Sequence, residues 1–578
     1  MSNFNLQPSI KVKHQYSCQK GWAEIAAQLA AASARVLVVE CYQGVHVENV
    51  IAEIEDHLKP ALLINSQEAM LEPAQIQQMV QPDVTDDRVF GYLTRLKISA
   101  FFDSQKIAAL RDQIQQTDGL VVIIGCGATL VMEKWDLLVY ADMARWEIQQ
   151  RMRRHEVDNL GLKNRHISDW MLLYKQGFFV DWRVLDRLKK QLFDKIDYLL
   201  DTNNPDQPKM VSYQAVLEGY NQAISQPFSV VPFFDPGPWG GQWMKEVCGL
   251  DRAEKNYAWC FNGVPEENSL LLDLGTDKIE IPSINLVFRH PEALLGAPVY
   301  GRFGDEFPIR FDFLDTMGGG NLSLQVHPLT QYIQQEFGMH YTQDESYYIM
   351  DAKPGAQVYL GLKEGVAPEA FIAALQKAQS DGSTFDDEQF VQTFPANKHD
   401  HFLIPAGTVH CQGKDSMVLE ISATPYIFTF KLYDWGRVGM DGRPRPINIA
   451  HGQEVIQWNR TSDWTRKNLV NQVQQIAEGD GWIEEKTGLH AAEFIETRRH
   501  WFSKITHHHT GDSVHVLALV EGEQAIIESP QGQFDPFVLN FAEVVILPAA
   551  LGAYSIRPYG PAEGKTCCTM KAFVRTQA

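Results

Sequence analysis

The hydrophobic pattern of the chain changes once, at about residue 230, and this change restricts the two halves to different kinds of fold. Before it, two continuous runs rich in β-branched residues, ARVLVVECY (34–42) and GLVVIIGCG (119–127), alternate with helical patterns such as SQKIAALRDQIQQ (104–116). Continuous apolar runs are typical of strands buried in a parallel sheet, and the order strand, helix, strand is typical of α/β folds. We predict an α/β domain with a parallel sheet over residues 1–230.

A Pro- and Gly-rich segment at 204–240 marks the boundary, and short strands separated by turn residues follow it. This pattern predicts an all-β sandwich or barrel, interrupted by helical insertions at 367–382 and 386–394. A hairpin followed by an apolar strand that ends in Pro-Ala occurs in both halves of this region, which looks like a duplicated double-stranded β-helix, a jelly roll of the cupin type. We therefore predict two cupin domains, over 231–450 and 451–578, the second without metal.

Charge and cysteine content restrict the class of protein. The 578 residues carry a formal net charge of −21, which argues against a nucleic-acid partner because phosphate backbones require a basic surface. Eight cysteines without CxxC spacing make a disulfide framework unexpected, and no apolar run suggests a signal peptide or membrane span. We expect a cytoplasmic protein without a membrane partner. Oligomer formation is left open, and a few local basic residues would still allow an anionic small substrate.

The turn after the first strand is where an α/β nucleotide-binding domain would carry its phosphate loop. Aligned on GxxxxGK[ST], this turn has Glu40, Val45, His46 and Val47 at the four defined positions. The glycines, the lysine and the hydroxyl that cradle phosphate and magnesium are all missing. The order of strand, turn and a later charged helix at 140–155 resembles uridine-kinase-like P-loop kinases. We predict a degenerate, kinase-like domain that performs no phosphoryl transfer.

The stretch NLSLQVHP (321–328) places Gln325 and His327 on one face of a strand, with the alternating leucines and valine on the other. A strand histidine is more often structural than a ligand. Two further candidates, Glu345 in QDESYYI and His410 in FLIPAGTVHCQGK, stand at strand entrances, although they could also be a surface carboxylate and a capped turn residue. An amide, two imidazoles and a carboxylate suit zinc in an open, catalytic site. The sequence THHHT (506–510) is better explained as a charged turn.

Several strings resemble, in order and spacing, the type I mannose-6-phosphate isomerases over about residues 235–578. They are PWGGQWM (238–244), FPIRFDFLDTMGGGNLSLQVHP (307–328), ESYYIMDAKPGAQVYLGLKEGV (345–366), HFLIPAGTVHCQGKDSMVLEIS (401–422) and YDWGRVGMDGRPRPINI (433–449). The resemblance implies a bicupin fold and one zinc ion per chain. The implied zinc ligands are Gln325, His327, Glu345 and His410. It also implies the interconversion of mannose 6-phosphate and fructose 6-phosphate through a cis-enediol, with a sugar phosphate as the small-molecule partner.

The resemblance also implies residues for the substrate. Arg437 in DWGR matches the family's active-site arginine and would stabilise enediolate charge, and Glu345 has a catalytic role. Ser323 resembles the serine that helps to hold the phosphate, and Lys363 and Arg443 are further phosphate partners. The base that moves the proton stays open among Glu345, His290 and a zinc-bound water.

This chain departs from the family pattern at the substrate end. Leu329 and Thr330 follow VHP where the family usually has two aspartates, Gln343 stands where a lysine is often found, and Asp312 replaces a frequent lysine. Loss of positive charge should weaken the binding of a dianion. Our leading hypothesis is a zinc-dependent sugar-phosphate isomerase fused to a silent kinase-like domain. The alternatives are a metal-bound sugar-phosphate sensor without turnover and an active kinase–isomerase fusion.

Overall fold

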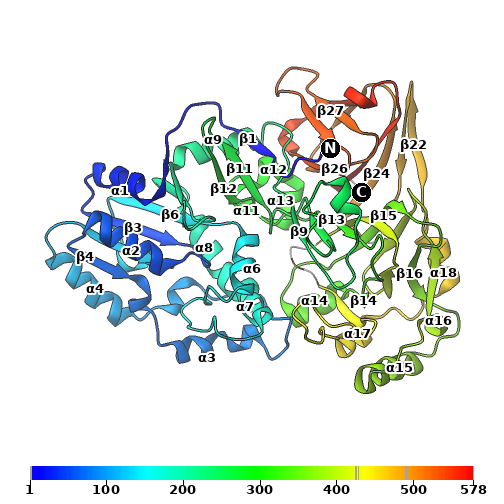
Figure 1. Cartoon of the computed structure of the whole chain (residues 1–578), viewed down its shortest axis with the longest axis horizontal. Coiled ribbons are helices and arrows are strands. Elements are labelled where there is room, and N and C mark those ends of the chain that lie inside the picture. The colour runs from blue at the N-terminus through cyan, green and yellow to red at the C-terminus, as the bar shows by residue number, and fades with distance from the viewer. Residues whose placement is uncertain (1–2, 424–425, 427, 489–492, 577–578) are drawn as a thin grey trace. The chain divides into compact units, whose positions relative to one another are not determined.

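The computed structural model describes residues 3–423, 426, 428–488 and 493–576, and the chain divides into two compact units (Figure 1). Residues 9–222 and 269–289 form the first, which we call the α/β unit. Residues up to 8, 223–268 and 290–578 form the second, the β-rich unit. Segment 269–289, which the sequence analysis assigned to the first predicted cupin domain, thus belongs to the α/β unit. Within the described residues, no helix is both long and apolar enough to cross a bilayer.

The α/β unit is built on a seven-stranded sheet with the order β2-β8-β7-β6-β3-β5-β4. The strands are β2 (Cys18–Lys20), β3 (Val36–Cys41), β4 (Leu62–Asn65), β5 (Val121–Gly125), β6 (Leu137–Asp142), β7 (Tyr198–Asp201) and β8 (Lys209–Ser212). The five strands from β4 to β7 in this order pair in parallel, and β8 and β2 add antiparallel strands at one edge. The predicted parallel sheet is therefore present at the centre of the unit.

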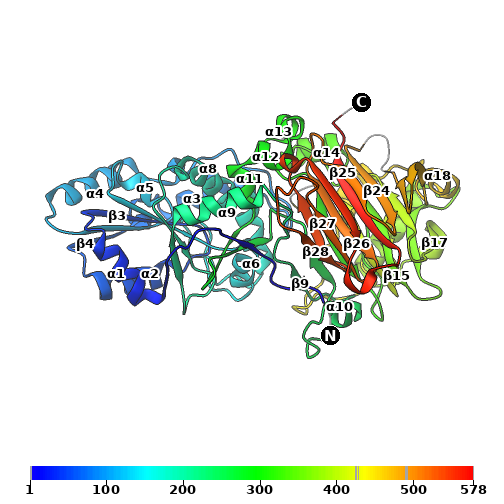
Figure 2. The ribbon, with the colours of Figure 1, turned by 90° about the horizontal axis from the view of Figure 1, so that it is seen from above.

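Helices cover both faces of this sheet. Figure 2 shows α1 (Gly21–Ala31) and α2 (Val47–Leu58) on one face, and α4 (Ser104–Gln116), α5 (Ala128–Val131) and α8 (Trp182–Leu192) on the other. The apolar stripes of α1 and α2 join alternate residues of the central strands in one buried cluster. Helix α4 coincides with the predicted helix, because Asp103 caps it by accepting bonds from the amides of Gln105 and Lys106.

The charged segment expected as a helix from residue 140 differs from that prediction. Tyr140 and Asp142 complete β6, and the helix α6 begins only at Arg145 and ends at Arg153. The reason is tertiary, because β6 lies between β3 and β7 in the sheet and is buried along its whole length. Because a central strand is buried on both faces, β6 continues into the first residues of the segment whose charged pattern predicted a helix.

Segment 269–289 adds a second, smaller sheet to the α/β unit. It contains β11 (Ser269–Asp273), β12 (Lys278–Pro282) and α11 (Ile284–Arg289), and β11 pairs in parallel with β1 (Ser9–Lys11). The Asn285 amide donates to the Asp142 carboxylate over 2.8 Å and accepts from the Lys189 ammonium over 3.0 Å. The segment thus completes the buried Lys189–Asp142 ion pair of the α/β unit.

The β-rich unit contains two pairs of sheets, and every ladder in them is antiparallel. In the first pair, one sheet contains β9 (Phe233–Asp235), β10 (Trp259–Phe261), β13 (Arg310–Asp315), β15 (Glu345–Ala352), β18 (His401–Ile404) and β20 (Ser416–Ser422). The sheet that faces it contains β14 (Leu324–Val326), β16 (Gln357–Leu362), β17 (Val391–Pro395), β19 (His410–Gln412) and β21 (Phe430–Tyr433). The second pair consists of β22 (Gln474–Gly479), β23 (Trp482–Lys486), β24 (Ile495–Phe502), β26 (His515–Glu521), β29 (Val544–Leu547) and β31 (Cys567–Val574), facing β25 (Thr506–His509), β27 (Gln524–Glu528), β28 (Phe537–Asn540) and β30 (Ala553–Pro558).

One of the two predicted helical insertions is a full helix. The first appears as α15 (Pro368–Asp381), which starts with proline and ends before Gly382 in a left-handed conformation. The second contains only the single turn α16 (Asp387–Phe390), after which the chain continues as strand β17. Its Val391 and Thr393 pair with β16, so sheet pairing overrides the short helical pattern.

Candidate metal centre

The two sheets of the first pair supply different members of the predicted ligand set. Gln325 lies on β14, with His327 directly after it, and His410 opens β19, where it stands opposite Gln325 in the ladder. Glu345 opens β15 in the facing sheet. All four side chains are buried, and Glu345 and His410 are fully inaccessible. The fold therefore brings together side chains that lie up to 85 positions apart in the sequence.

The ligand atoms of His327, Glu345 and His410 lie within 4.8 Å of one another. The Nε2 atom of His410 is 2.8 Å from Oε1 of Glu345, and the Nε2 atom of His327 is 3.1 Å from Oε2. The Gln325 amide lies 3.1 Å from Nε2 of His410. Within the described part of the chain, this is the one such group of histidine, cysteine and acidic side chains with the spacing of a metal site.

Backbone carbonyls determine which imidazole nitrogens face the centre. Nδ1 of His327 lies 2.8 Å from the carbonyl oxygen of Phe428, and Nδ1 of His410 lies 2.8 Å from that of Thr408. A carbonyl only accepts, so each Nδ1 carries a proton and the neutral ring directs the Nε2 lone pair toward Glu345. Lone pairs of the imidazoles then face a carboxylate, and neither Nε2 of His327 nor Oε1 of Glu345 has a hydrogen-bond partner among the residues that the structure describes. A divalent cation satisfies all of these atoms, so the residues present fit a metal ion.

The electrostatics of the centre favour an ionised carboxylate. Burial by itself would raise the pKa of Glu345, but without a cation the attraction of the two imidazoles in their protonated form holds it well below its ordinary range. Burial lowers the pKa of His410, whereas at His327 the attraction of Glu345 exceeds the effect of burial and raises the pKa. A buried anion beside imidazole nitrogen atoms is the donor set that zinc prefers.

Gln343 holds two parts of the centre in position. Its amide nitrogen donates to Oε2 of Glu345 over 3.1 Å, and its amide oxygen accepts from the backbone amide of Phe428 over 3.0 Å. Phe428 is also the residue whose carbonyl orients His327. The residue that the sequence analysis treated only as a lost lysine therefore positions both a carboxylate and an imidazole.

Replacing Gln343 with alanine should weaken metal binding by about 10- to 100-fold, the usual effect of removing a group that orients a ligand. The Glu345 carboxylate would lose its amide donor, and the backbone amide of Phe428 would lose its acceptor. Metal affinity is measured by competition with a chromogenic chelator. The fold, followed by circular dichroism, should not change, and an unaltered affinity would exclude the positioning role.

Two further buried acidic residues, Asp312 and Glu420, lie near Glu345. Asp312 on β13 stands opposite Glu420 on β20, and Nε of Arg310 donates to Asp312 over 2.7 Å. Burial, together with repulsion by Glu345 and Asp312, raises the pKa of Glu420 well above its ordinary range. Asp312, which the sequence analysis counted as lost positive charge, is thus paired with an arginine in the interior.

Two of the predicted substrate residues meet at Asp434. Ser323 donates to Oδ1 of Asp434 over 2.8 Å, and Nη2 of Arg437 lies 2.5 Å from the same oxygen. Arg445 joins this group, donating to Oδ2 of Asp434 over 2.9 Å and to Ser323 over 3.1 Å. The sequence analysis did not select Asp434 or Arg445. The sequence signal for them is that YDWGR contains an acidic residue and that RPR, a few residues later, contains basic residues that could pair with it.

The other predicted substrate residues lie elsewhere in the unit. The Lys363 ammonium donates to the backbone carbonyl of Glu388. Arg443 is half-buried in a tight turn, where its backbone amide donates to Asp441. His290, one of the candidates for the base, precedes α12 (Pro291–Leu295), whose last carbonyl accepts from Val514 next to β26 of the second sheet pair.

The second sheet pair contains a histidine cluster that includes part of THHHT, whose residues 506–509 form strand β25 and not the predicted charged turn. Of the three histidines in THHHT, His507 and His509 are exposed, while the His508 ring lies 4.7 Å from that of His500 on β24. Lys571 and Glu484, which are 3.2 Å apart, lie near them, and His515 bonds to Tyr554 over 3.1 Å. Burial lowers the pKa of His500 to about 4.

This cluster should make the protein sensitive to acid. A histidine pKa of about 4 in the folded state, against 6.5 when unfolded, means that the unfolded state binds more protons between these values. The stabilisation is complete above pH 6.5 and is lost progressively as the pH falls from 6.5 to 4, by up to about 3 kcal/mol for one such group. Urea unfolding at pH 7 and pH 4.5 checks this, because His500→Phe should lose less stability than the parent over that interval. Equal losses would contradict the assignment to His500.

Comparison with known proteins gives matches of two kinds. A protein family described as a domain of unknown function (DUF8485) matches residues 21–225. Mannose-6-phosphate isomerase ManA of Bacillus subtilis (strain 168) is 27% identical over 154 residues, which cover 27% of this chain and 45% of that protein. Mannose-6-phosphate isomerase of Streptococcus mutans (serotype c) is 26% identical over 230 residues, or 39% of this chain and 66% of that protein.

A solved structure, the mannose 6-phosphate isomerase from Bacillus subtilis, aligns with 60% of this chain and 99% of its own length, with a TM-score of 0.49 and 19% identity. The chain thus spans between about half and two thirds of the length of these two curated relatives. Over about 40% of its residues, this chain is similar in sequence to mannose-6-phosphate isomerases.

Proposed function

We propose that the β-rich unit is a zinc-dependent aldose–ketose isomerase that interconverts mannose 6-phosphate and fructose 6-phosphate, or a related sugar phosphate. The observation that carries the proposal is the buried carboxylate of Glu345 facing two imidazole Nε2 atoms whose Nδ1 atoms are already bonded to carbonyls. Gln325, His327, Glu345 and His410 would hold the ion. The sequence similarity to mannose-6-phosphate isomerases supports the substrate class.

The reaction moves a proton between C1 and C2 of the sugar, so the site must hold a proton-transfer group and stabilise an oxyanion. A bound zinc ion would supply Lewis acidity toward the sugar oxygens. Arg437, whose side chain is 18% exposed, would stabilise the enediolate charge. Ser323 and Arg445 would bind the phosphate beside it, because a guanidinium suits phosphate bidentately.

One observation favours a second candidate, a metal-bound sensor of sugar phosphates without turnover. The cations that a phosphate would need are already engaged, since Arg437 and Arg445 both contact Asp434 and Lys363 donates to a backbone carbonyl. A ligand must compete with the Asp434 carboxylate for the two guanidinium groups. If this competition kept the sugar phosphate away from the metal centre, the protein would bind the sugar phosphate without converting it.

One experiment separates the two candidates. The full chain is loaded with zinc, its metal content is determined by mass spectrometry, and conversion of mannose 6-phosphate and other hexose phosphates is followed by a coupled assay. The isomerase requires one zinc ion per chain and turnover with at least one substrate. A melting temperature raised by sugar phosphate without turnover supports the sensor, and a chain that binds no divalent metal refutes both.

A further inference from the structure

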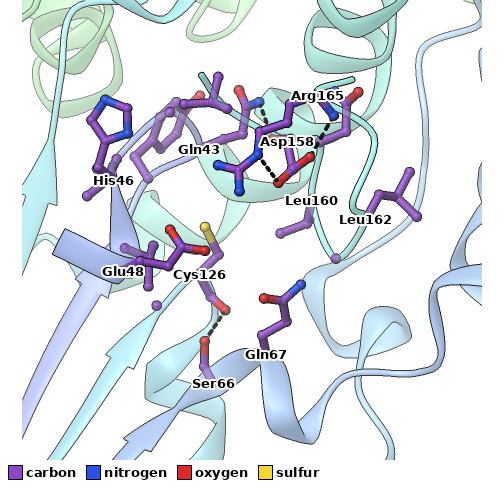
Figure 3. Close-up of a pocket in the computed structure, with 18 of the residues that line it drawn as sticks. Gln43, His46, Glu48, Ser66, Gln67, Cys126, Asp158, Leu160, Leu162 and Arg165 are labelled. Carbon is purple, nitrogen blue, oxygen red and sulfur yellow. Dashed lines mark hydrogen bonds and ion pairs between the residues drawn. The ribbon is translucent and has the colours of Figure 1, made fainter. Parts of the chain in front are cut away.

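The α/β unit contains an open pocket with a volume of about 100 Å³. Four segments line it: residues 42–48 after β3, residues 65–67 at the end of β4, residues 125–126 at the end of β5, and the loop 156–162 with Arg165. Figure 3 shows their side chains around a common space. Ligands of open α/β sheets bind outside the carboxyl ends of the strands, which is where this pocket lies.

Near the pocket, the backbone amides that could bind an anion already donate hydrogen bonds to a carboxylate of the protein itself. Glu40, the residue in place of the first glycine of a phosphate loop, accepts bonds from the Gly127 amide over 2.5 Å and the Thr129 amide over 2.9 Å. The Thr129 hydroxyl donates to the same carboxylate over 2.8 Å. A phosphate group would have to displace this buried side chain, so the amides at the start of α5 are closed to anionic ligands.

The charges around the pocket also disfavour a polyphosphate. The Arg165 guanidinium lies 3.6 Å from Asp158, and the His46 ring, at the position of the phosphate-loop lysine, lies 3.8 Å from Glu156. Burial and the positive charge of Arg151 lower the pKa of His46, so it is mainly neutral at pH 7. Glu48, an exposed carboxylate on the pocket wall, has no ion pair among the described residues. Negative charge is therefore in excess.

Side chains that remain free to bond suit hydroxyl groups. The Glu48 carboxylate accepts, the neutral His46 ring offers a donor or an acceptor, and the Gln67 amide does both. In Figure 3 the Glu48 carboxylate and the Gln67 amide lie on either side of Cys126, and the His46 ring lies above Glu48 in the view. Neighbouring hydroxyls on a ring can each pair with such groups, because a carboxylate accepts from two hydroxyls at once.

We propose that this pocket binds an uncharged polyhydroxylated ring, such as a free sugar or the ribose of a nucleoside, and rejects nucleoside polyphosphates. The α/β unit would then be a binding module for a second, neutral ligand, independent of the chemistry at the metal centre. Glu48 and Gln67 are the principal recognition residues.

The test uses the full zinc-loaded chain at pH 7.5. Mannose, glucose, uridine and adenosine are titrated by calorimetry, and ATP with magnesium forms the anionic arm. Because a free sugar could also enter the β-rich unit, hydrogen–deuterium exchange locates each ligand. We expect a sugar or a nucleoside to protect peptides over 43–48, 65–70 and 156–165 from exchange. Comparing the two sugars with the two nucleosides identifies which class of ligand the pocket binds. ATP should give no protection there.

Variants determine whether the pocket side chains carry the binding. Glu48→Gln should weaken the ligand that binds by about tenfold or more, and Gln67→Ala by about threefold or more. Glu55→Gln is the matched control, because it removes the same charge from an exposed position on the same helix, outside the pocket, and should change affinity less than twofold. Protection by ATP, no protection by any neutral ligand, or equal effects of Glu48→Gln and Glu55→Gln would overturn the proposal.

Discussion

Glu345→Gln should lose tightly bound zinc and at least about 1,000-fold of any isomerase activity. The carboxylate is the anionic group between the two imidazole Nε2 atoms, at 2.8 and 3.1 Å, and it is fully buried. An amide of the same shape carries no charge and directs an N–H group toward atoms that must bind a cation. A loss of about 4 kcal/mol corresponds to a factor of about 1,000 in affinity. Metal content after dialysis against a chelator and the mannose 6-phosphate assay measure both effects.

The control for this variant is Glu369→Gln, which removes the same charge from an exposed position on α15. It should keep both metal and activity at the parent level. Circular dichroism must show that Glu345→Gln is folded, so that loss of metal is not a consequence of unfolding. A folded Glu345→Gln protein that retains one tightly bound zinc ion would refute the metal centre described above.

A chain that ends at residue 230 should fail to fold, although the hydrophobic pattern changes there. It lacks segment 269–289, whose Leu270, Leu272, Ile279 and Ile281 are fully buried in the α/β unit. Each such side chain contributes about 1.5–3 kcal/mol on burial, so the four together contribute about 6–12 kcal/mol. This equals the whole stability of a typical domain. Far-ultraviolet circular dichroism and thermal unfolding of the purified fragment measure the effect.

The matched control is a chain in which residues 9–222 continue through a flexible Gly/Ser linker into 269–289. It restores the β1–β11 ladder and the Asn285 bonds to Asp142 and Lys189. This chain should unfold cooperatively, whereas the fragment 1–230 should aggregate or stay unfolded. A cooperative transition of the shorter fragment, with a similar midpoint, would show that the segment is dispensable.

Local patterns in the sequence predicted the features that depend on neighbouring residues. The continuous apolar runs indicated the parallel strands β3 and β5, and a capped helical pattern indicated α4. Period-two alternation placed Gln325 and His327 on one face of a strand, because successive side chains in a strand point to opposite faces. The resemblance to isomerases named Glu345 and His410 as their partners.

Tertiary contacts decided the features that depend on residues far apart in the chain. No local pattern indicates that Glu345 enters the centre from the facing sheet, that carbonyl groups of residues 408 and 428 orient the imidazoles, or that Arg445 joins Asp434. The same holds for the end of β6 at Asp142. The strand continues into a segment with a charged helical pattern because it is buried between two neighbouring strands.

The sequence by itself determined the two kinds of secondary structure, the change between them at about residue 230 and the strand face that carries Gln325 and His327. Only the tertiary structure decided that residues 269–289 return to the α/β unit and that backbone carbonyls orient the two imidazoles toward the carboxylate. The physical reason is that periodicity records which face of an element is buried. It does not record which distant element covers that face, because any apolar surface of suitable shape could do so.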